Sequence, residues 1–254
     1  MKRFFYFLIF LLAGFNTMAQ RTYVKNLTTF DDKRIHFGFT LGINTVDFNF
    51  SHYNRVSSNP KFNPAPGSID YTYKDSMVRA DISSLIPGFT VAIVTNLRLN
   101  DNFDLRFLPG MSFGERKLVY NIPLYDRSAS ITTPLSSYSI KSTFLDFPVL
   151  FKYKAKRMNN QRPYVIAGAA YRIDISKSGK EDLVSLKPAS ASIETGVGWD
   201  TYLQFFRLST ELKFSFGLDN VLGASPAALG NNQVYSSAFS RLSSNMFILS
   251  FHFE

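Results

Sequence analysis

The sequence predicts an all-β protein, an eight-stranded antiparallel transmembrane β-barrel with an N-terminal signal peptide. The stretch Phe89–Gly114 shows the pattern best, because most odd positions are apolar on both sides of a turn at Asn100–Asn102. Successive side chains of a strand point to opposite faces, so this stretch predicts two antiparallel strands with one apolar face. Each has roughly ten residues, about the length that a tilted strand needs to cross a bilayer. No helical pattern elsewhere could cover that face.

The composition agrees with an all-β class and excludes others. The 254 residues include 26 Phe, 13 Tyr and 14 Gly, and no uninterrupted apolar run is long enough for a transmembrane helix. The chain has no Cys, which rules out disulfides, thiol nucleophiles and thiolate metal sites. The net charge of +9 could attract nucleic acid, but the basic residues are dispersed over the chain, so we expect no nucleic-acid partner.

The first residues have the pattern of a targeting segment. Lys2 and Arg3 precede the apolar run Phe4–Phe15, and small residues at Thr17–Ala19 form a cleavage site. We therefore expect a signal peptide at residues 1–19. A polar N-terminal periplasmic arm at residues 20–34 and an outer-membrane barrel at residues 35–254 should follow.

Eight alternating segments divide the predicted barrel, the first from Ile35 and the last ending beside Phe253. In the first segment the apolar residues change parity at Thr45/Val46, which either a bulge or emergence from the membrane would explain. Long loops are expected at residues 51–84, 122–141, 176–188 and 219–240, and short turns after the second, fourth and sixth strands. Long loops on one side and short turns on the other are typical of Gram-negative outer-membrane barrels.

A secreted β-sandwich or a lipocalin-like barrel is the soluble alternative. Its outward face should be polar, whereas here the face opposite the apolar one carries the charges. We expect these charges to fill the narrow lumen as a paired network, since an eight-stranded barrel has room only for its own side chains and buried charges need partners. The predicted network is Arg98, Asp104, Arg106, Asp146, Lys152, Arg172, Asp174, Glu194, Asp200, Glu211 and Lys213.

An enzyme is the next hypothesis, since some small outer-membrane barrels are hydrolases or acyltransferases. The only histidines are His36, His52 and His252. His36 and His252 share lumen parity and could meet on closure, but such a pair more often satisfies polar groups than catalyses. No metal-ligand spacing and no glycine-rich phosphate motif is present. We therefore expect no enzyme activity, no catalytic residue, no cofactor, no metal and no small-molecule substrate.

The predicted turn between the fourth and fifth strands is strongly basic, with Lys154, Lys156, Arg157 and Arg162. The plainest interpretation is a solvated turn or a contact with anionic lipid of the inner leaflet. Our hypothesis is that these residues also bind an acidic periplasmic partner.

Several stretches of the chain resemble the PorT family, the small outer-membrane barrel of the type IX secretion system. They are Phe37–Asn44, Asp47–Phe48, Phe103–Gly110, Ser112–Gly114, Leu145–Pro148, Phe151–Lys154, Asn159–Asn160, Arg162–Tyr164 and Tyr171–Arg172. The resemblance implies an accessory or assembly role in exporting cargo proteins, with a link to gliding motility, and partners among the other secretion proteins besides the surrounding lipid. The alternative is a stand-alone OmpX- or OmpW-like barrel for adhesion or for passage of a small apolar solute.

Overall fold

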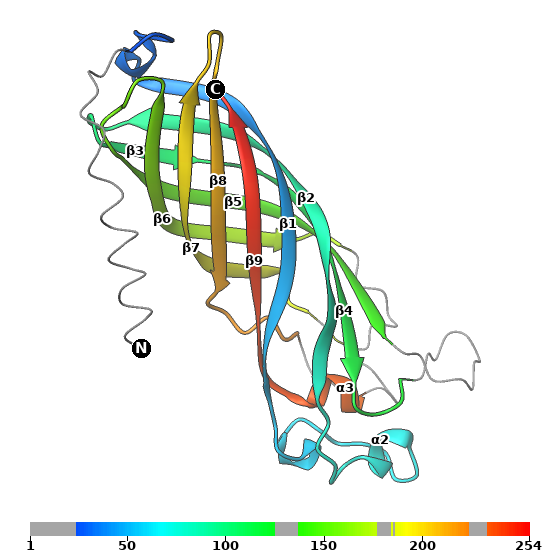
Figure 1. Cartoon of the computed structure of the whole chain (residues 1–254). Helices are drawn as coiled ribbons and strands as arrows, with labels where there is room; N and C mark the ends of the chain where they lie inside the picture. The colour runs from blue at the N-terminus through cyan, green and yellow to red at the C-terminus, as the bar shows by residue number, and fades with distance from the viewer. Residues whose placement is uncertain (1–23, 125–136, 177–183, 185, 224–232) are drawn as a thin grey trace, which may run out of the picture.

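The computed structural model of the protein describes residues 24–124, 137–176, 184, 186–223 and 233–254. The predicted signal peptide lies outside these residues. The described residues form one antiparallel sheet that closes on itself, with short helical turns before its first strand (η1) and in its connections (η2, α2 and α3) (Figure 1). The strands are β1 (Ile35–His52), β2 (Ala80–Arg98), β3 (Phe103–Phe107), β4 (Gly110–Tyr120), β5 (Tyr138–Lys154), β6 (Gln161–Asp174), β7 (Ala189–Tyr202), β8 (Arg207–Gly217) and β9 (Phe239–Phe253). The helical turns are η1 (Phe30–Asp32), η2 (Val56–Ser58), α2 (Ile69–Thr72) and α3 (Gln233–Ser237).

The strands β3 and β4 share one place in the ring, because both pair with β2 on one side and with β5 on the other. The break falls at Leu108 and Pro109, where the proline has no N–H to give to a ladder. The ladder nevertheless continues across it, since Leu108 N–H donates to Pro148 O at 3.2 Å and Ile93 N–H donates to Pro109 O at 2.9 Å. The predicted eight-stranded barrel is therefore confirmed, with its third strand interrupted.

The connections gather by length at the two ends of the barrel. Turns 99–102, 155–160 and 203–206 lie beside the C-terminus at one end, here called the short-turn end (Figure 1). The longer connections, with η2, α2 and α3, lie at the opposite, long-loop end. The predicted bounds of the first two long loops were wrong by up to five residues: β1 runs on to His52, β2 already begins at Ala80, and β5 begins at Tyr138.

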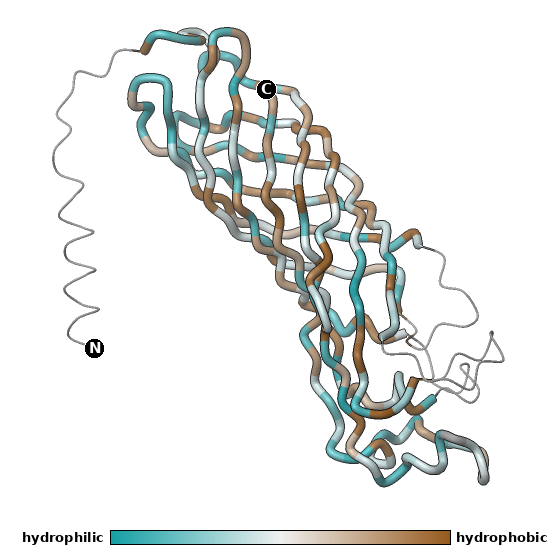
Figure 2. Tube along the Cα trace, turned by 45° about the vertical axis from the view of Figure 1, so that its right-hand side comes forward, coloured by the Kyte–Doolittle hydropathy of each residue, from teal (hydrophilic) through white to brown (hydrophobic). Residues whose placement is uncertain are grey.

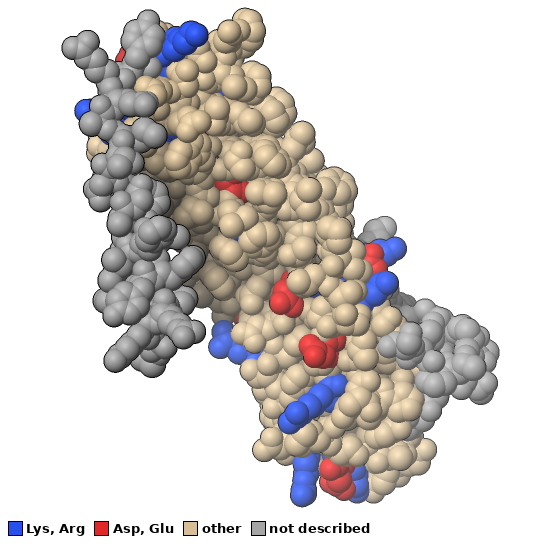
Figure 3. All heavy atoms as spheres, in the orientation of Figure 1, with Lys and Arg blue, Asp and Glu red and all other residues tan. Residues whose placement is uncertain are grey.

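The outer wall of the barrel is apolar, as a lipid-facing surface would be. Ile43 is 56% exposed and Ile93 59% exposed, although both lie well inside strands. Figure 2 shows brown, hydrophobic positions along the strands, and Figure 3 shows a broad band almost free of charged side chains on the face it draws. Tyr153, Trp199 and Phe103 stand on this wall near the short turns, at 42–48% exposure.

The change of pattern in β1 does not come from a bulge. The side chains keep their facing, and it is the inward positions that change from polar to apolar. The pairing of β1 with β9 runs without a register shift from Phe39 to Ser51. Asn44, Val46 and Phe48 are therefore all inward and buried, while Asp47 is exposed. Of the two explanations offered for the parity change, emergence from the membrane is the one that fits.

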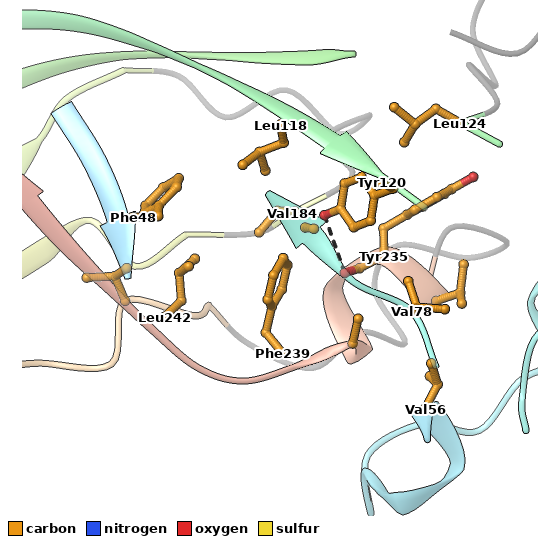
Figure 4. Packing of buried hydrophobic residues seen from close by; sticks show 14 residues of the cluster. Phe48, Val56, Val78, Leu118, Tyr120, Leu124, Val184, Tyr235, Phe239 and Leu242 are labelled. Atoms are coloured by element: carbon orange, nitrogen blue, oxygen red, sulfur yellow. Dashed lines mark hydrogen bonds between the residues drawn. The ribbon is translucent and has the colours of Figure 1, made fainter. Parts of the chain in front are cut away.

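Beyond this level the interior of the barrel is an ordinary hydrophobic core (Figure 4). It joins Phe48, Leu118, Tyr120, Phe239 and Leu242 of the strands with residues of the long connections. Tyr120 Oη donates to the carbonyl of Tyr235 at 3.5 Å. The long-loop end is thus closed by apolar packing, which we call the apolar plug and define by these buried residues: Phe48, Val56, Val78, Ala80, Leu118, Tyr120, Leu124, Val184, Val221, Val234, Tyr235, Ala238, Phe239 and Leu242.

Replacing Leu118 by Ala should destabilise the barrel, because its fully buried side chain leaves a cavity in the apolar plug. We expect the free energy of unfolding to fall by about 2–5 kcal/mol, measured by urea unfolding of the refolded barrel in detergent. Val119→Ala, next to it on the outward face, is the control and should cost less than about 1.5 kcal/mol. Equal losses in the two variants would contradict the plug.

Candidate functional site

The lumen of the barrel is filled by charged side chains from several strands. Nine of the predicted residues are buried there: Asp104, Arg106, Asp146, Lys152, Arg172, Glu194, Asp200, Glu211 and Lys213. Each takes part in at least one ion pair. We call these nine side chains, with Lys154, Arg207 and Glu254, the lumen network.

Arg106 links opposite sides of the barrel. Its Nη1 donates to Glu211 Oε2 at 2.7 Å, and its Nη2 lies 3.5 Å from Glu254 Oε1. Tyr164 Oη donates to the same Glu211 oxygen at 2.8 Å, and His252 Nε2 lies 3.4 Å from Glu211 Oε1. Since Arg106 lies on β3 and Glu211 on β8, this pair spans the lumen and leaves no open bore at its level.

Lys152 and Asp200 form the neighbouring pair. Lys152 Nζ lies 2.8 Å from both Asp200 oxygens and 3.6 Å from the ring centre of Tyr164. Asp200 also accepts from Ser209 Oγ at 2.5 Å and faces Arg207 at 3.8 Å. The carboxylate is therefore held by two cations and a hydroxyl, which offsets part of the cost of burying it.

Two further groups of ion pairs complete the lumen network. Lys154 Nζ lies 2.6 Å from Asp104. Arg172 Nε donates to Asp146 at 2.6 Å, and Lys213 Nζ lies 2.7 Å from Glu194. Between these groups remains a cavity of about 20 Å³ lined by Thr40, Ser112, Asp146, Arg172 and His252 among others, room for roughly one water molecule. Such a space is far smaller than a substrate pocket.

Arg98 and Asp174, also predicted for the lumen network, lie at its rims. The Arg98 guanidinium pairs with Asp101 of the adjacent turn and is 27% exposed. Asp174 accepts from the backbone N–H of Ser176 at 2.9 Å at the long-loop end. Both continue the inward parity of their strands, but each strand ends there, so their side chains turn to local partners.

Sequence reasoning missed Arg207 and Glu254 as members of the lumen network. Arg207 is 1% exposed and pairs with both Asp200 and Glu254. Parity could have found them, because Arg207 continues the series of Ser209 and Glu211, and Glu254 follows His252.

Arg116 is a further buried cation that was missed, and it has no carboxylate partner among the ion pairs of the described residues. It lies over the ring of Phe48 at 4.0 Å and donates to Ser142 Oγ at 3.1 Å. Arg116 thus joins the lumen network to the apolar plug.

The arm before β1 covers the short-turn end. Asp31 faces the guanidinium groups of Arg157 at 3.7 Å and Arg162 at 3.5 Å, and it accepts from Tyr202 Oη at 3.0 Å. Phe30 stacks on His36 with ring centres 4.1 Å apart. The arm, which the sequence predicts to be polar, is therefore packed against the barrel mouth from Asn26 on.

Because the arm covers this end of the barrel, fewer residues of the basic turn are free to contact a partner than the sequence predicts. Lys154 is buried with Asp104, and Arg162 is 7% exposed and donates to the Ala155 carbonyl at 2.7 Å. The Arg157 side chain is 9% exposed and donates to the backbone of the arm. Of the four residues predicted to contact a partner, Lys156 alone is exposed.

The histidines have separate surroundings. His252 Nδ1 lies 2.7 Å from Thr40 Oγ1 inside the lumen, and His36 lies under Phe30. The described residues contain no group of acids and histidines that could hold a metal ion. Within the same residues, no helix has the length and apolarity needed to cross a membrane.

The barrel wall opens between β1 and β2 at the long-loop end. Their pairing stops at Thr45↔Pro87, although β1 continues to His52 alongside β9, and β2 begins at Ala80 alongside β4 (Figure 1). We call the two unpaired edges, residues 46–52 and 80–86, the seam. A groove of about 640 Å³ lies over it, lined by Asn49, Phe50, His52, Arg79, Ala80, Asp81, Tyr120 and Asn121 among others.

The seam is spanned by one described hydrogen bond and its edges are partly protected. Ala80 N–H donates to His52 Nε2 at 3.1 Å. The N–H of Phe48 is bonded to Asp47 at 2.7 Å and that of Ile82 to Asp81 at 2.8 Å. Carboxylates that occupy edge N–H groups hinder unwanted pairing with another strand.

Removing one partner of the Lys152–Asp200 pair should strongly destabilise the barrel. For Lys152→Met we expect the free energy of unfolding to fall by about 3–5 kcal/mol, because Asp200 is left buried with too little positive charge. Urea unfolding in detergent measures it. Lys156→Met is the matched control, within about 0.5 kcal/mol of the wild type, and Lys152→Met with Asp200→Asn should recover part of the loss. A near-neutral Lys152→Met would refute the assigned pair.

The seam should loosen in acid. Burial, and next the Arg79 cation, hold the pKa of His52 below its usual value. The hydrogen bond from Ala80 N–H to His52 Nε2 is then fully present above the unfolded-state pKa of about 6.5. It is lost as the pH falls through the lower pKa that His52 has in the folded protein, because Nε2 then gains a proton. We expect the hydrogen-exchange protection of the Ala80 amide to drop about ten-fold over this window. In His52→Phe the protection should be low at every pH; a pH response that persists there would contradict the assignment.

The chain was compared with known proteins by structure and by sequence. The solved structures that it resembles include the outer membrane protein OprG from Pseudomonas aeruginosa (TM-score 0.45, 10% identity, 87% of this chain and 93% of that one). They also include Neisserial surface protein A (TM-score 0.41, 11% identity, 87% and 99%) and Ail of Yersinia pestis in complex with a heparin analogue (TM-score 0.36, 10% identity, 87% and 98%). No curated protein matches the sequence.

The family is shown by the sequence itself. Residues 18–223 match the model of the outer membrane protein beta-barrel domain. The apolar wall, the closed ring and the distribution of loop lengths all fit that family, in which short turns are periplasmic and long loops extracellular. The chain belongs to the outer membrane protein beta-barrel domain family and is a protein of the Gram-negative outer membrane.

Proposed function

We propose that this protein is a non-conducting, stand-alone barrel that binds a partner at the cell surface and so serves adhesion. The observation that carries the proposal is the filled interior: ion pairs occupy the lumen, and the apolar plug closes the extracellular end. A barrel filled in this way acts through its surfaces. Passage of a small apolar solute through the lumen is the less favoured form of the stand-alone role, because the charged lumen network would have to be dismantled.

The extracellular end of the barrel carries the surfaces that could bind a partner. The seam groove combines polar groups, such as Asn49 and Asn121, with the aromatic ring of Phe50. A second hollow, of about 680 Å³, is lined by Tyr53, Lys61 and Lys187 among others. Both volumes fall in the range of ligand sites. We propose no catalytic role, since the buried acids and bases of the described lumen face one another and not a cavity that could hold a substrate.

An accessory role in type IX secretion is the second candidate, and the resemblance to PorT supports it. Among the residues that carry the resemblance, Asp104, Arg106, Asp146, Lys152 and Arg172 belong to the lumen network. The likeness thus extends to the groups that fill the barrel, and a filled barrel suits an assembly component better than a conduit. Partners would be other secretion proteins, with Lys156 the exposed cation of the basic turn.

A clean deletion separates the two candidates. Under the stand-alone role, deletion should lower attachment of cells to matrix-coated surfaces while type IX cargo stays on the cell surface, as surface proteomics measures. Loss of cargo from the surface would instead select the secretion role.

Complementation then tests the seam groove. Asn49→Arg with Asp81→Arg, which fills and recharges the groove, should fail to restore attachment. The control Ser58→Arg, at an exposed loop position outside the groove, should restore it. Normal attachment with the groove variant would exclude the groove as the binding surface.

A further inference from the structure

The lipid-facing wall has a hollow near its periplasmic edge. This groove of about 550 Å³ crosses β5 to β9, and its lining is almost wholly apolar. The side chains that shape it include Tyr153, Val165, Val197, Trp199, Leu212 and Leu249. It lies on the outside of the barrel, separate from the lumen network and from the extracellular seam.

Small residues make the wall thin at this point. Gly198 and Ala155 contribute no bulk, so the groove reaches the ring of Tyr164, which also lines it. A Cβ at position 198 would lie 2.2 Å from Tyr164 Cζ, so only glycine fits there. Tyr164 is held by its hydrogen bond to Glu211 and by Lys152 over its ring. The hollow is therefore a fixed feature of the wall, not a rotamer of one surface side chain.

The periplasmic end of the groove lies at the membrane interface. Trp199 and Tyr153 flank it, at the depth where amphipathic rings meet lipid headgroups. Ala155 lines the groove, and the next residue, Lys156, is exposed on the periplasmic turn. Its basic neighbours Lys154 and Arg157 are engaged by Asp104 and Asp31, whereas Lys156 has no ion pair among the described residues.

From these observations we propose that the groove is a binding site for an anionic phospholipid of the periplasmic leaflet. An acyl chain lies in the groove against Val165, Val197 and Leu212, and the phosphate-bearing headgroup meets the ammonium group of Lys156. The apolar lining demands a hydrocarbon occupant, since it faces the bilayer core. The cation of Lys156, one residue beyond the lining residue Ala155, gives the site its preference for negative charge.

The sequence supplies its own probe, because Trp199 is the only tryptophan in the chain. The refolded full-length protein is placed in phosphatidylcholine bilayers that contain either brominated phosphatidylglycerol or brominated phosphatidylcholine at equal mole fraction. Bromine quenches the indole only on contact. We expect brominated phosphatidylglycerol to compete for the site about five-fold better.

Variants distinguish the proposed site from ordinary lipid contact. Lys156→Gln should abolish the preference, and Lys61→Gln, the same change at the extracellular end, should keep it. Ala155→Phe should fill the groove and lower quenching by both lipids, with folding checked by gel mobility of unheated samples. Equal quenching by the two lipids in the wild type, or a preference that survives Lys156→Gln, would overturn the proposal. Absence of quenching by either lipid would also overturn it, by showing that protein covers the groove.

Discussion

The whole architecture depends on one constraint: the interior of an eight-stranded barrel is too narrow to stay empty and too dry to hold unpaired charge. The lumen network meets it by matching charge between strands. Asp146 and Arg172 are directly paired in the β5–β6 register and also form an ion pair. If either strand slipped by one residue, its own member of this pair would turn toward lipid and leave the other charge buried without its partner. The ion pairs thus specify the register of the barrel as well as filling it.

Alternation along the strands was enough to predict the fold and the inward set of charges, since parity is a local property. The choice of partner for each charged side chain is not a local property. Arg106 and Glu211 lie on opposite sides of the ring, and their contact depends on the curvature and stagger of the whole sheet. Arg207 and Glu254 are different, because they face each other across the adjacent strands β8 and β9. Their parity was visible in the sequence, but their position at strand ends made them resemble turn residues.

The basic turn shows a second limit of sequence reasoning. Several cations close together favour an acidic partner, and that inference is sound, but the nearest anion belongs to the chain itself. Asp31 lies on the arm, more than a hundred residues away in sequence, and it faces Arg157 and Arg162. A polar arm gives no periodic pattern, so nothing in its sequence indicated where it would pack.

The seam fixes the position of the membrane by an argument that is independent of hydropathy. Inside hydrocarbon every backbone group of a strand must be paired, whereas outside it water can satisfy an open edge. The described pairing of β1 with β2 covers Ile35 to Thr45 and then stops, a length of about eleven residues that matches the roughly 9–11 needed to cross a bilayer. Asp47, the first outward charge of β1 beyond that point, is exposed. The hydrocarbon therefore extends no further out than Thr45, and both the unpaired edges and the His52 bond across them lie in water, where the proposed surface partner could reach them.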